Sequence, residues 1–181
     1  MSPEDPGSII AEGEAKLTAG DLDGALQAFL RAVAAAPTSA LAHSKVGIVH
    51  VHKKQWDDAA GAFTRAIQLD PTYAPAYSNL GNVYRERRQF DQAIAQYQKA
   101  ITMDPDYWIA HQNLGVVYKQ QGRVGEAVRE FKIATRLSLR APIAGRGGAG
   151  GMARGRRSGC LGSGGMMILA TVAVATALRL S

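Results

Sequence analysis

The sequence predicts an all-α protein made of stacked helical repeats, because one pattern of small and aromatic residues returns four times at a spacing of 34 residues. Its members are Gly13, Gly47, Gly81 and Gly115; Ala25, Ala59, Ala93 and Ala127; Phe29, Phe63, Tyr97 and Phe131; Ala32, Ala66, Ala100 and Ala134; and Pro37, Pro71 and Pro105. A fixed period of this length is typical of arrays in which each unit buries its apolar face against its neighbours. We therefore expect a scaffold with a binding surface.

Each unit is predicted to hold two antiparallel helices, and residues 74–107 show this most clearly. The first helix has apolar residues spaced at i, i+3, i+4 and i+7, namely Tyr77, Leu80, Gly81 and Tyr84. The second has Phe90, Ala93, Ile94, Tyr97 and Ile101, and Asp91 near its start complements the helix dipole. Gly81 lies where the two helices must approach closely, so a larger residue would force them apart. Pro105 cannot continue a helix, so the unit ends there.

The unit resembles the tetratricopeptide repeat, whose first helix carries Leu-Gly and Tyr and whose second carries Ala, an aromatic residue, Ala and Pro. The matches are Tyr77, Leu80, Gly81, Tyr84, Ala93, Tyr97, Ala100 and Pro105 in 74–107; Val46, Gly47, Ala59, Phe63, Ala66 and Pro71 in 40–73; Leu114, Gly115, Tyr118, Ala127, Phe131 and Ala134 in 108–141; and Ala25, Phe29, Ala32 and Pro37 in 6–39. The departures are His43 and His50, Leu139 in place of the proline, and Glu12 and Lys16 in the first unit. The resemblance implies a solenoid over residues 6–141.

The positive charge of the chain belongs to its last 40 residues. Residues 1–141 carry 16 Lys and Arg against 15 Asp and Glu, whereas residues 142–181 carry five Arg and no acid. The overall charge of +6 is therefore no evidence that the repeats bind nucleic acid. Residues 142–158 are rich in glycine and arginine and are predicted to be a flexible linker.

Residues 159–178 are uncharged, and 20 residues are enough for a helix across a bilayer, although the densely apolar part covers only residues 166–178. We expect a carboxy-terminal transmembrane helix; a capping helix on the last unit and a tail without a role remain open. Arg154, Arg156 and Arg157 are then membrane-proximal, and the positive-inside rule places the repeats in the cytoplasm. The alternative is a soluble cytoplasmic protein.

Neither a catalytic nor a metal site is expected. The histidines are His43, His50, His52 and His111, of which His43 and His111 occupy a packing position of the repeat, so we interpret them as structural. Cys160 is the only cysteine, and no GxSxG, HExxH or phosphate-binding glycine loop occurs. We predict a non-enzymatic chain without cofactors.

The resemblance implies a concave groove, lined by the first helices, that binds a protein or peptide. The predicted groove residues are Lys45, His52, Asn79, Asn82, Arg85, Asn113, Val116 and Lys119. Asparagine can both donate to and accept from a peptide backbone, although solvated asparagines with no such role are an equal alternative. The clamp that binds the carboxyl terminus of heat-shock chaperones is not present, because Ser44, Ile48 and Ile109 occupy its positions.

These features predict a membrane-tethered adaptor. Two alternatives remain: an RNA-associated protein that uses its Arg/Gly tail, although that tail lacks aromatic residues for stacking on bases, and the recruiting subunit of a separate enzyme. A basic rim at the turns between paired helices comprises Lys53, Lys54, Arg87, Arg88 and Arg123. It has two interpretations, favourable charges at helix ends or a contact with an acidic partner.

Overall fold

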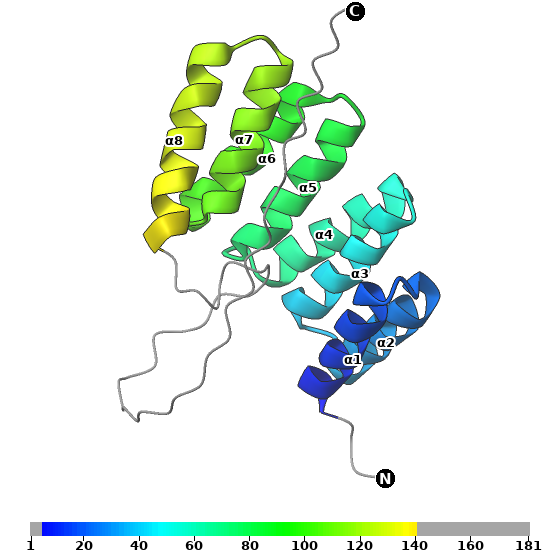
Figure 1. Ribbon diagram of the computed structural model, residues 1–181. Coiled ribbons are helices and arrows are strands. Elements are labelled where there is room, and N and C mark those ends of the chain that lie inside the picture. Colours follow the sequence, from blue (N-terminus) through cyan, green and yellow to red (C-terminus); the bar gives the residue numbers. More distant parts are fainter. Residues whose placement is uncertain (1–4, 141–181) are drawn as a thin grey trace, which may run out of the picture. The chain divides into compact units, whose positions relative to one another are not determined.

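The computed structural model describes residues 5–140, which form eight α-helices and no strand (Figure 1). The first helices of the units, the A helices, are α1 (Pro6–Thr18), α3 (Ala40–His52), α5 (Ala74–Glu86) and α7 (Trp108–Gln120). The second helices, the B helices, are α2 (Leu22–Ala35), α4 (Trp56–Leu69), α6 (Phe90–Met103) and α8 (Val124–Arg140). The all-α repeat fold is thus confirmed for the described part of the chain.

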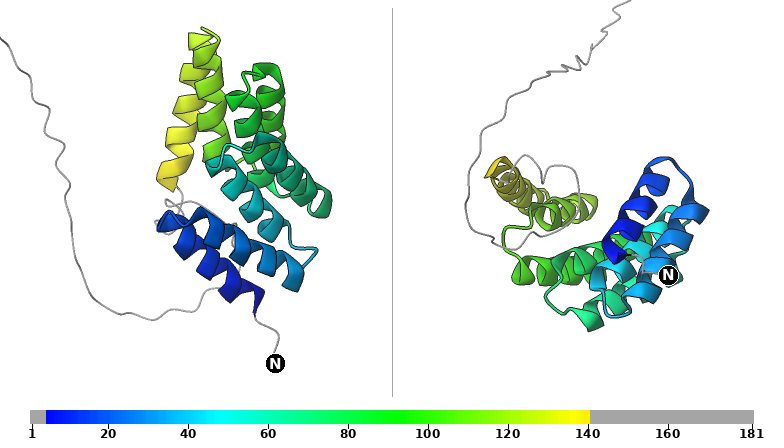
Figure 2. Two further views of the ribbon diagram at one scale, coloured as in Figure 1. Left: turned by 90° about the vertical axis from the view of Figure 1, so that its right-hand side faces the viewer. Right: turned by 90° about the horizontal axis from the view of Figure 1, so that it is seen from below.

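The helices pack in sequence order, pair by pair. The most extensive contacts join the A and B helices of one unit, and each B helix also packs against the A helix that follows it. The two further views in Figure 2 show the same succession of pairs from α1 and α2 to α7 and α8. The main contacts between helices of residues 5–140 are therefore made within a unit or with an adjacent one, as expected for a solenoid.

Helix starts are fixed by polar side chains in the first units. The Asp5 carboxylate accepts a hydrogen bond from the Ser8 amide at 3.0 Å, and the Asp21 carboxylate accepts one from the Gly24 amide at 2.8 Å. Such caps satisfy amides that have no partner inside the helix. In the later B helices this position is held by Gln55 and Gln89, which make no capping bond. Their first turns instead carry acidic residues, which complement the helix dipole.

The turn from A to B helix has the same backbone conformation in all four units. Its second residue has a positive φ: 82° at Gly20, 58° at Lys54, 59° at Arg88 and 75° at Gly122. This left-handed conformation is usual for glycine after a helix, but it is unfavourable for a residue with a Cβ. Lys54 and Arg88 therefore show that the packing of the helix pair dictates the turn.

The core repeats one contact, in which the glycine of each A helix faces the aromatic ring of its own B helix. A Cβ built on Gly81 would lie 2.6 Å from Cε1 of Tyr97, and one on Gly47 would lie 2.7 Å from Cε1 of Phe63. Gly13 and Gly115 have the same relation to Phe29 and Phe131. The predicted need for a small residue is confirmed, and the obstacle is the aromatic ring rather than the opposite backbone.

The last B helix differs from the other three in length. α2, α4 and α6 end one residue before a capping residue that is followed by Pro37, Pro71 or Pro105. Leu139 stands at the equivalent place in α8, and this helix continues to Arg140. Without the proline, the helix loses no amide hydrogen there and meets no steric stop.

The predicted linker 142–158 and the predicted transmembrane segment 159–178 lie outside the described residues. Among the helices of residues 5–140, none combines the length and the apolarity needed to cross a bilayer.

Candidate functional site

The A helices lie closer to one another than the B helices do. Within residues 5–140, α5 contacts both α3 and α7, whereas no two B helices have a comparable contact. Helices on the inner side of a curved stack are the more closely spaced ones, so the A helices are on the side where a ligand groove is expected. All eight predicted groove residues lie on α3, α5 and α7.

Asn82 on α5 is held by the paired B helix. The Tyr97 hydroxyl donates to Oδ1 of Asn82 at 2.8 Å. Tyr97 is fully buried, and this burial raises the pKa of its phenol above the ordinary value, so that it remains a donor. The Asn82 oxygen is therefore engaged, while its NH₂ group has no partner among the described residues.

Asn113 on α7 is held through its NH₂ group, by a residue of the preceding unit. Its Nδ2 donates to Oγ of Ser78 on α5 at 3.3 Å, and Ser78 itself is almost fully buried. Ser78 also interacts with the phenol of Tyr107, whose pKa is raised to about 12, chiefly by burial. The Asn113 oxygen is left as an acceptor. Ser78 is not among the predicted groove residues, although a serine recurs one period earlier, at Ser44.

The charged groove residues are partly neutralised by neighbours. Lys45 is buried and forms an ion pair with Glu14 on α1, and Arg85 pairs with Glu86 at 2.9 Å. Of the remaining predicted residues, His52 and Lys119 are exposed, while Asn79 and Val116 are half-buried. Because Lys45 and Arg85 have carboxylate partners, the predicted groove is less basic than its composition indicates.

Two of the four histidines, His43 and His111, make the structural contacts expected of them. His43 Nε2 donates to the Pro37 carbonyl at 3.1 Å, and the Tyr77 hydroxyl makes the equivalent bond with the Pro71 carbonyl, also at 3.1 Å. His111 Nδ1 lies 2.7 Å from Oε2 of Glu130, which joins α7 to α8. Across residues 5–140, no cluster of His, Cys, Asp or Glu side chains is suited to hold a metal ion. These bonds support the structural interpretation of the histidines.

Two of the five basic-rim residues, Lys53 and Arg87, link one unit to the next. Lys53 Nζ lies 2.6 Å from the Asp23 carboxylate, and Arg87 Nη2 lies 2.5 Å from that of Asp57. Both pairs join residues 30 positions apart, across two units. The sequence carried the signal, because an aspartate recurs at this position in units one to three, but we interpreted Asp91 only as a charge at a helix start.

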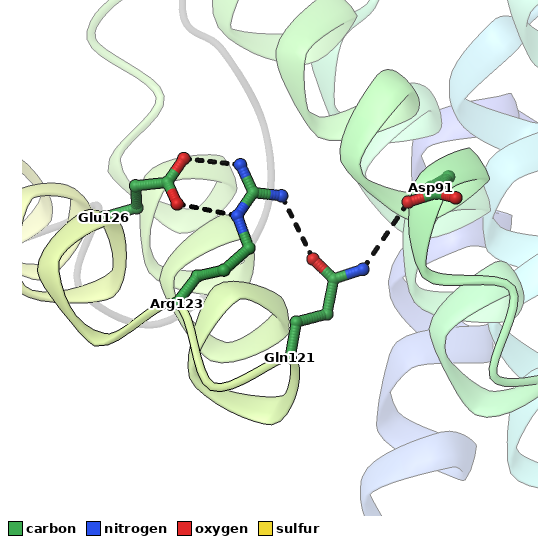
Figure 3. A network of polar contacts seen from close by, with 4 residues as sticks. All are labelled: Asp91, Gln121, Arg123 and Glu126. Atoms are coloured by element: carbon green, nitrogen blue, oxygen red, sulfur yellow. Dashed lines mark hydrogen bonds and ion pairs between the residues drawn. The ribbon is translucent and has the colours of Figure 1, made fainter.

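In the last unit the same link is made by an amide. Gln121 donates to Asp91 at 3.5 Å and accepts from Arg123 at 3.1 Å (Figure 3). Arg123 forms two bonds with the Glu126 carboxylate and lies over the Tyr118 ring, 4.2 Å from its centroid. Arg123 is thus engaged within its own unit, whereas Lys54 and Arg88 are exposed and have no partner within residues 5–140.

The predicted membrane-proximal residues Arg154, Arg156 and Arg157 lie outside the described residues.

Comparison with known proteins gives a consistent family. Models described as "Tetratricopeptide repeat" match residues 10–74 and 62–95, and one described as "TPR repeat" matches residues 81–122. A crystal structure of MamA is 30% identical, with a TM-score of 0.64, and the match covers 77% of this chain and 81% of that one. No curated protein matches the sequence.

Two further structures extend this comparison. MamA from Desulfovibrio magneticus RS-1 is 26% identical over 75% of this chain and 77% of that one, with a TM-score of 0.62. Pseudomonas aeruginosa pilF has a TM-score of 0.67 and is 24% identical over 73% of this chain and 60% of that one. At that identity the pilF match bears on the fold alone.

Proposed function

Because the chain belongs to the tetratricopeptide repeat family, we propose that it is a non-catalytic scaffold that binds a protein or peptide partner along its A helices. Proteins of this family generally mediate protein–protein interactions. The proposed groove comprises the residues Lys45, His52, Asn79, Asn82, Arg85, Asn113, Val116 and Lys119.

The observation that supports this proposal best is the complementary fixing of two amides. Asn82 has its oxygen engaged by Tyr97 and its NH₂ group available, whereas Asn113 has one N–H engaged by Ser78 and its oxygen available. One amide thus offers donors and the other an acceptor, which are the two functions needed to bind the C=O and N–H groups of a peptide backbone. Their partners hold both side chains before a ligand arrives, which lowers the entropy cost of binding.

A photo-crosslinking experiment tests the groove. A benzoylphenylalanine placed at Val116 on α7 is expected to crosslink a discrete partner in cells, whereas the same residue at Ala95, exposed on α6, is the matched control. Asn82→Ala with Asn113→Ala should remove the crosslinked species without unfolding the array. If the yield is unchanged by these substitutions, or if position 95 captures the same partner, the groove proposal is wrong.

We also propose that residues 159–178 tether the scaffold to a membrane with the repeats in the cytoplasm. Support comes from the sequence alone: 20 uncharged residues preceded by Arg154, Arg156 and Arg157. Tethering would raise the effective concentration of the groove near membrane partners. Full-length protein should resist alkaline carbonate extraction from membranes, and deletion of 159–181 should release it. Extraction of the full-length protein would refute the tether and leave the groove proposal untouched.

A further inference from the structure

The last helix, α8, presents a surface that the other B helices have covered. Val128, Phe131, Thr135 and Leu139 line one side of it. One, two and three periods earlier, the first three of these positions are occupied by residues packed under the next A helix. In unit three they are Ile94, Tyr97 and Ile101, which pack with Leu114, Val117 and Tyr118 of α7. Units one and two repeat this arrangement with α3 and α5.

On α8 the corresponding apolar groups are exposed. Val128 is 44% exposed and Leu139 69%, and Phe131 is only half-buried. Continuing the period places the next A helix at residues 142–154, but five of those 13 residues are glycine, which is a poor helix former. From the sequence we therefore expect no helix in register with this face.

The same helix carries four exposed cations, Arg129, Lys132, Arg136 and Arg140. Arg129 interacts electrostatically with Glu126, whereas the other three have no partner within residues 5–140. Three of them line the apolar surface directly. None of the equivalent positions in the other B helices is basic: Gln98 and Thr102 of α6, for example, stand where α8 has Lys132 and Arg136. Among the described units, these positions are therefore basic only in the last one, where the apolar face of α8 is open.

The N-terminal end of the array, formed by α1, shows how a solvent-exposed terminal face is made polar in this protein. Glu12 on α1 stands where Val46 and Leu80 pack in later units, and it is paired with Lys16 at 2.7 Å and with Arg31 at 3.1 Å. These partners, Lys16 first, lower the pKa of the Glu12 carboxyl. At that end the charges compensate each other locally, whereas Lys132, Arg136 and Arg140 on α8 have no such partner within residues 5–140.

We propose that α8 docks an amphipathic helix of another protein, with an apolar stripe and acidic flanks, in the place that α7 takes on α6. The three covered B helices show that this surface fits a helix, and the three cations that line it, Lys132, Arg136 and Arg140, favour acidic flanks. Docking of a second copy of the chain through its own α8 would bring like charges together. Residues 141–181 contain five arginines and no acid, so they do not complement this charge either. This site is separate from the A-helix groove.

The test uses the full chain and two labelled 13-residue peptides. Both keep the α7 residues Ala110, Leu114, Val117 and Tyr118; the other positions are mostly Glu in one peptide and mostly Lys in its twin. Fluorescence anisotropy at about 0.1 M salt, where exposed charges still interact, should show at least tenfold tighter binding of the acidic peptide.

Variants locate the site. Val128→Glu should weaken the acidic peptide at least tenfold, and Lys132→Glu with Arg136→Glu should reverse the preference between the twins. The matched control is Lys99→Glu, at an exposed cation on α6, which should leave the affinity for both peptides unchanged. Asn82→Ala, in the separate groove, should also leave these two affinities unchanged. Equal binding of the two peptides, or indifference to the α8 variants, overturns the proposal. Because Val128, Lys132, Arg136 and Lys99 are exposed, circular dichroism should show an intact array for the variants at these positions.

Two further outcomes separate other occupants. In a Cys160→Ser background, Val128→Cys should react with a thiol reagent as fast as Lys99→Cys; reaction at least tenfold slower would mean that this chain covers its own α8 and would overturn the proposal. Vesicles of phosphatidylcholine and phosphatidylserine should bind the Lys132→Glu, Arg136→Glu variant and the unaltered chain equally. If instead the variant loses vesicle binding and neither peptide is preferred, the face serves a lipid surface.

Discussion

Phe63 and Phe131 occupy the same position of two units, and each faces the glycine of its own A helix. Phe63 is nevertheless fully buried, whereas Phe131 is only half-buried. The contact within the unit is identical in kind. What differs is the next A helix, since α5 covers the Phe63 side of α4 and no described helix covers α8. Each unit therefore encodes its own internal packing but depends on its neighbour for burial, which is the basis of nearest-neighbour stability in repeat proteins.

The largest expected effect is the difference in free energy of unfolding between the Phe63→Ala and Phe131→Ala variants. The first removes a fully buried ring and should lower the free energy of unfolding by about 3–5 kcal/mol. The second should cost about half as much, because part of that ring is already in water. Denaturant unfolding of both variants measures this. Equal losses would show that Phe131 is covered in solution.

A smaller effect is expected when a methyl group is added under the ring. Gly81→Ala should lower the free energy of unfolding by about 1–3 kcal/mol, because its Cβ would lie 2.6 Å from the enclosed Tyr97 ring. Gly115→Ala should cost less, since Phe131 can move toward its open side. The comparison uses the same denaturant titrations. A neutral Gly81→Ala variant would contradict the tight contact.

At alkaline pH, the thermal stability of the unaltered chain should fall more steeply than that of the Tyr107→Phe variant. Because burial raises the Tyr107 pKa from 10.0 to about 12, the folded state retains a proton that the unfolded state loses. This contribution is complete below about pH 10 and is lost as the pH rises toward about 12. Between pH 9 and pH 11 the Tm of the unaltered chain should therefore fall further than that of Tyr107→Phe. Parallel declines in Tm would refute this role.

The smallest effect concerns the link between units. A double-mutant cycle on Asp57 and Arg87 should give a coupling of about 0.2–0.5 kcal/mol, because the Asp57 side chain is 95% exposed and its charge is well screened. The coupling should decrease when the salt is raised to about 1 M. A coupling above about 1 kcal/mol that persists in salt would mean that the pair is more enclosed than it is here.

Contacts that repeat with the period were the predictable part of the fold. The need for a small residue at Gly81 follows from the close approach of the two helices within one unit and could be predicted, whereas the contact of Gly81 with the Tyr97 ring was seen only in the structure. The partners of the groove residues were not predictable in this way. Asn113 reaches Ser78 across 35 residues, and the ion pair of Lys45 with Glu14 also crosses a unit boundary, so both depend on how closely successive A helices approach.

The Asp57–Arg87 link is an intermediate case. Its aspartate recurs with the period, so the pattern was visible, but helix-dipole logic alone accounted for the residue and concealed its second role. The positions of Asn82 and Asn113 on the A helices were predicted from the resemblance. Which end of each amide is engaged depends on the neighbouring side chains and could be seen only in the structure. Side-chain orientation, rather than location, is what sequence spacing could not supply.

Because each glycine contacts the aromatic ring of its own unit, a duplicated copy of residues 74–107 inserted after residue 107 would carry both halves of that contact with it. Its first helix would meet α6 with the residues that α5 offers to α4, and its copy of Arg87 would reach Asp91 as Arg87 reaches Asp57. A gene encoding this chain can therefore gain or lose a unit by in-frame duplication or deletion without compensating changes elsewhere. The length of the scaffold is open to selection independently of its internal packing.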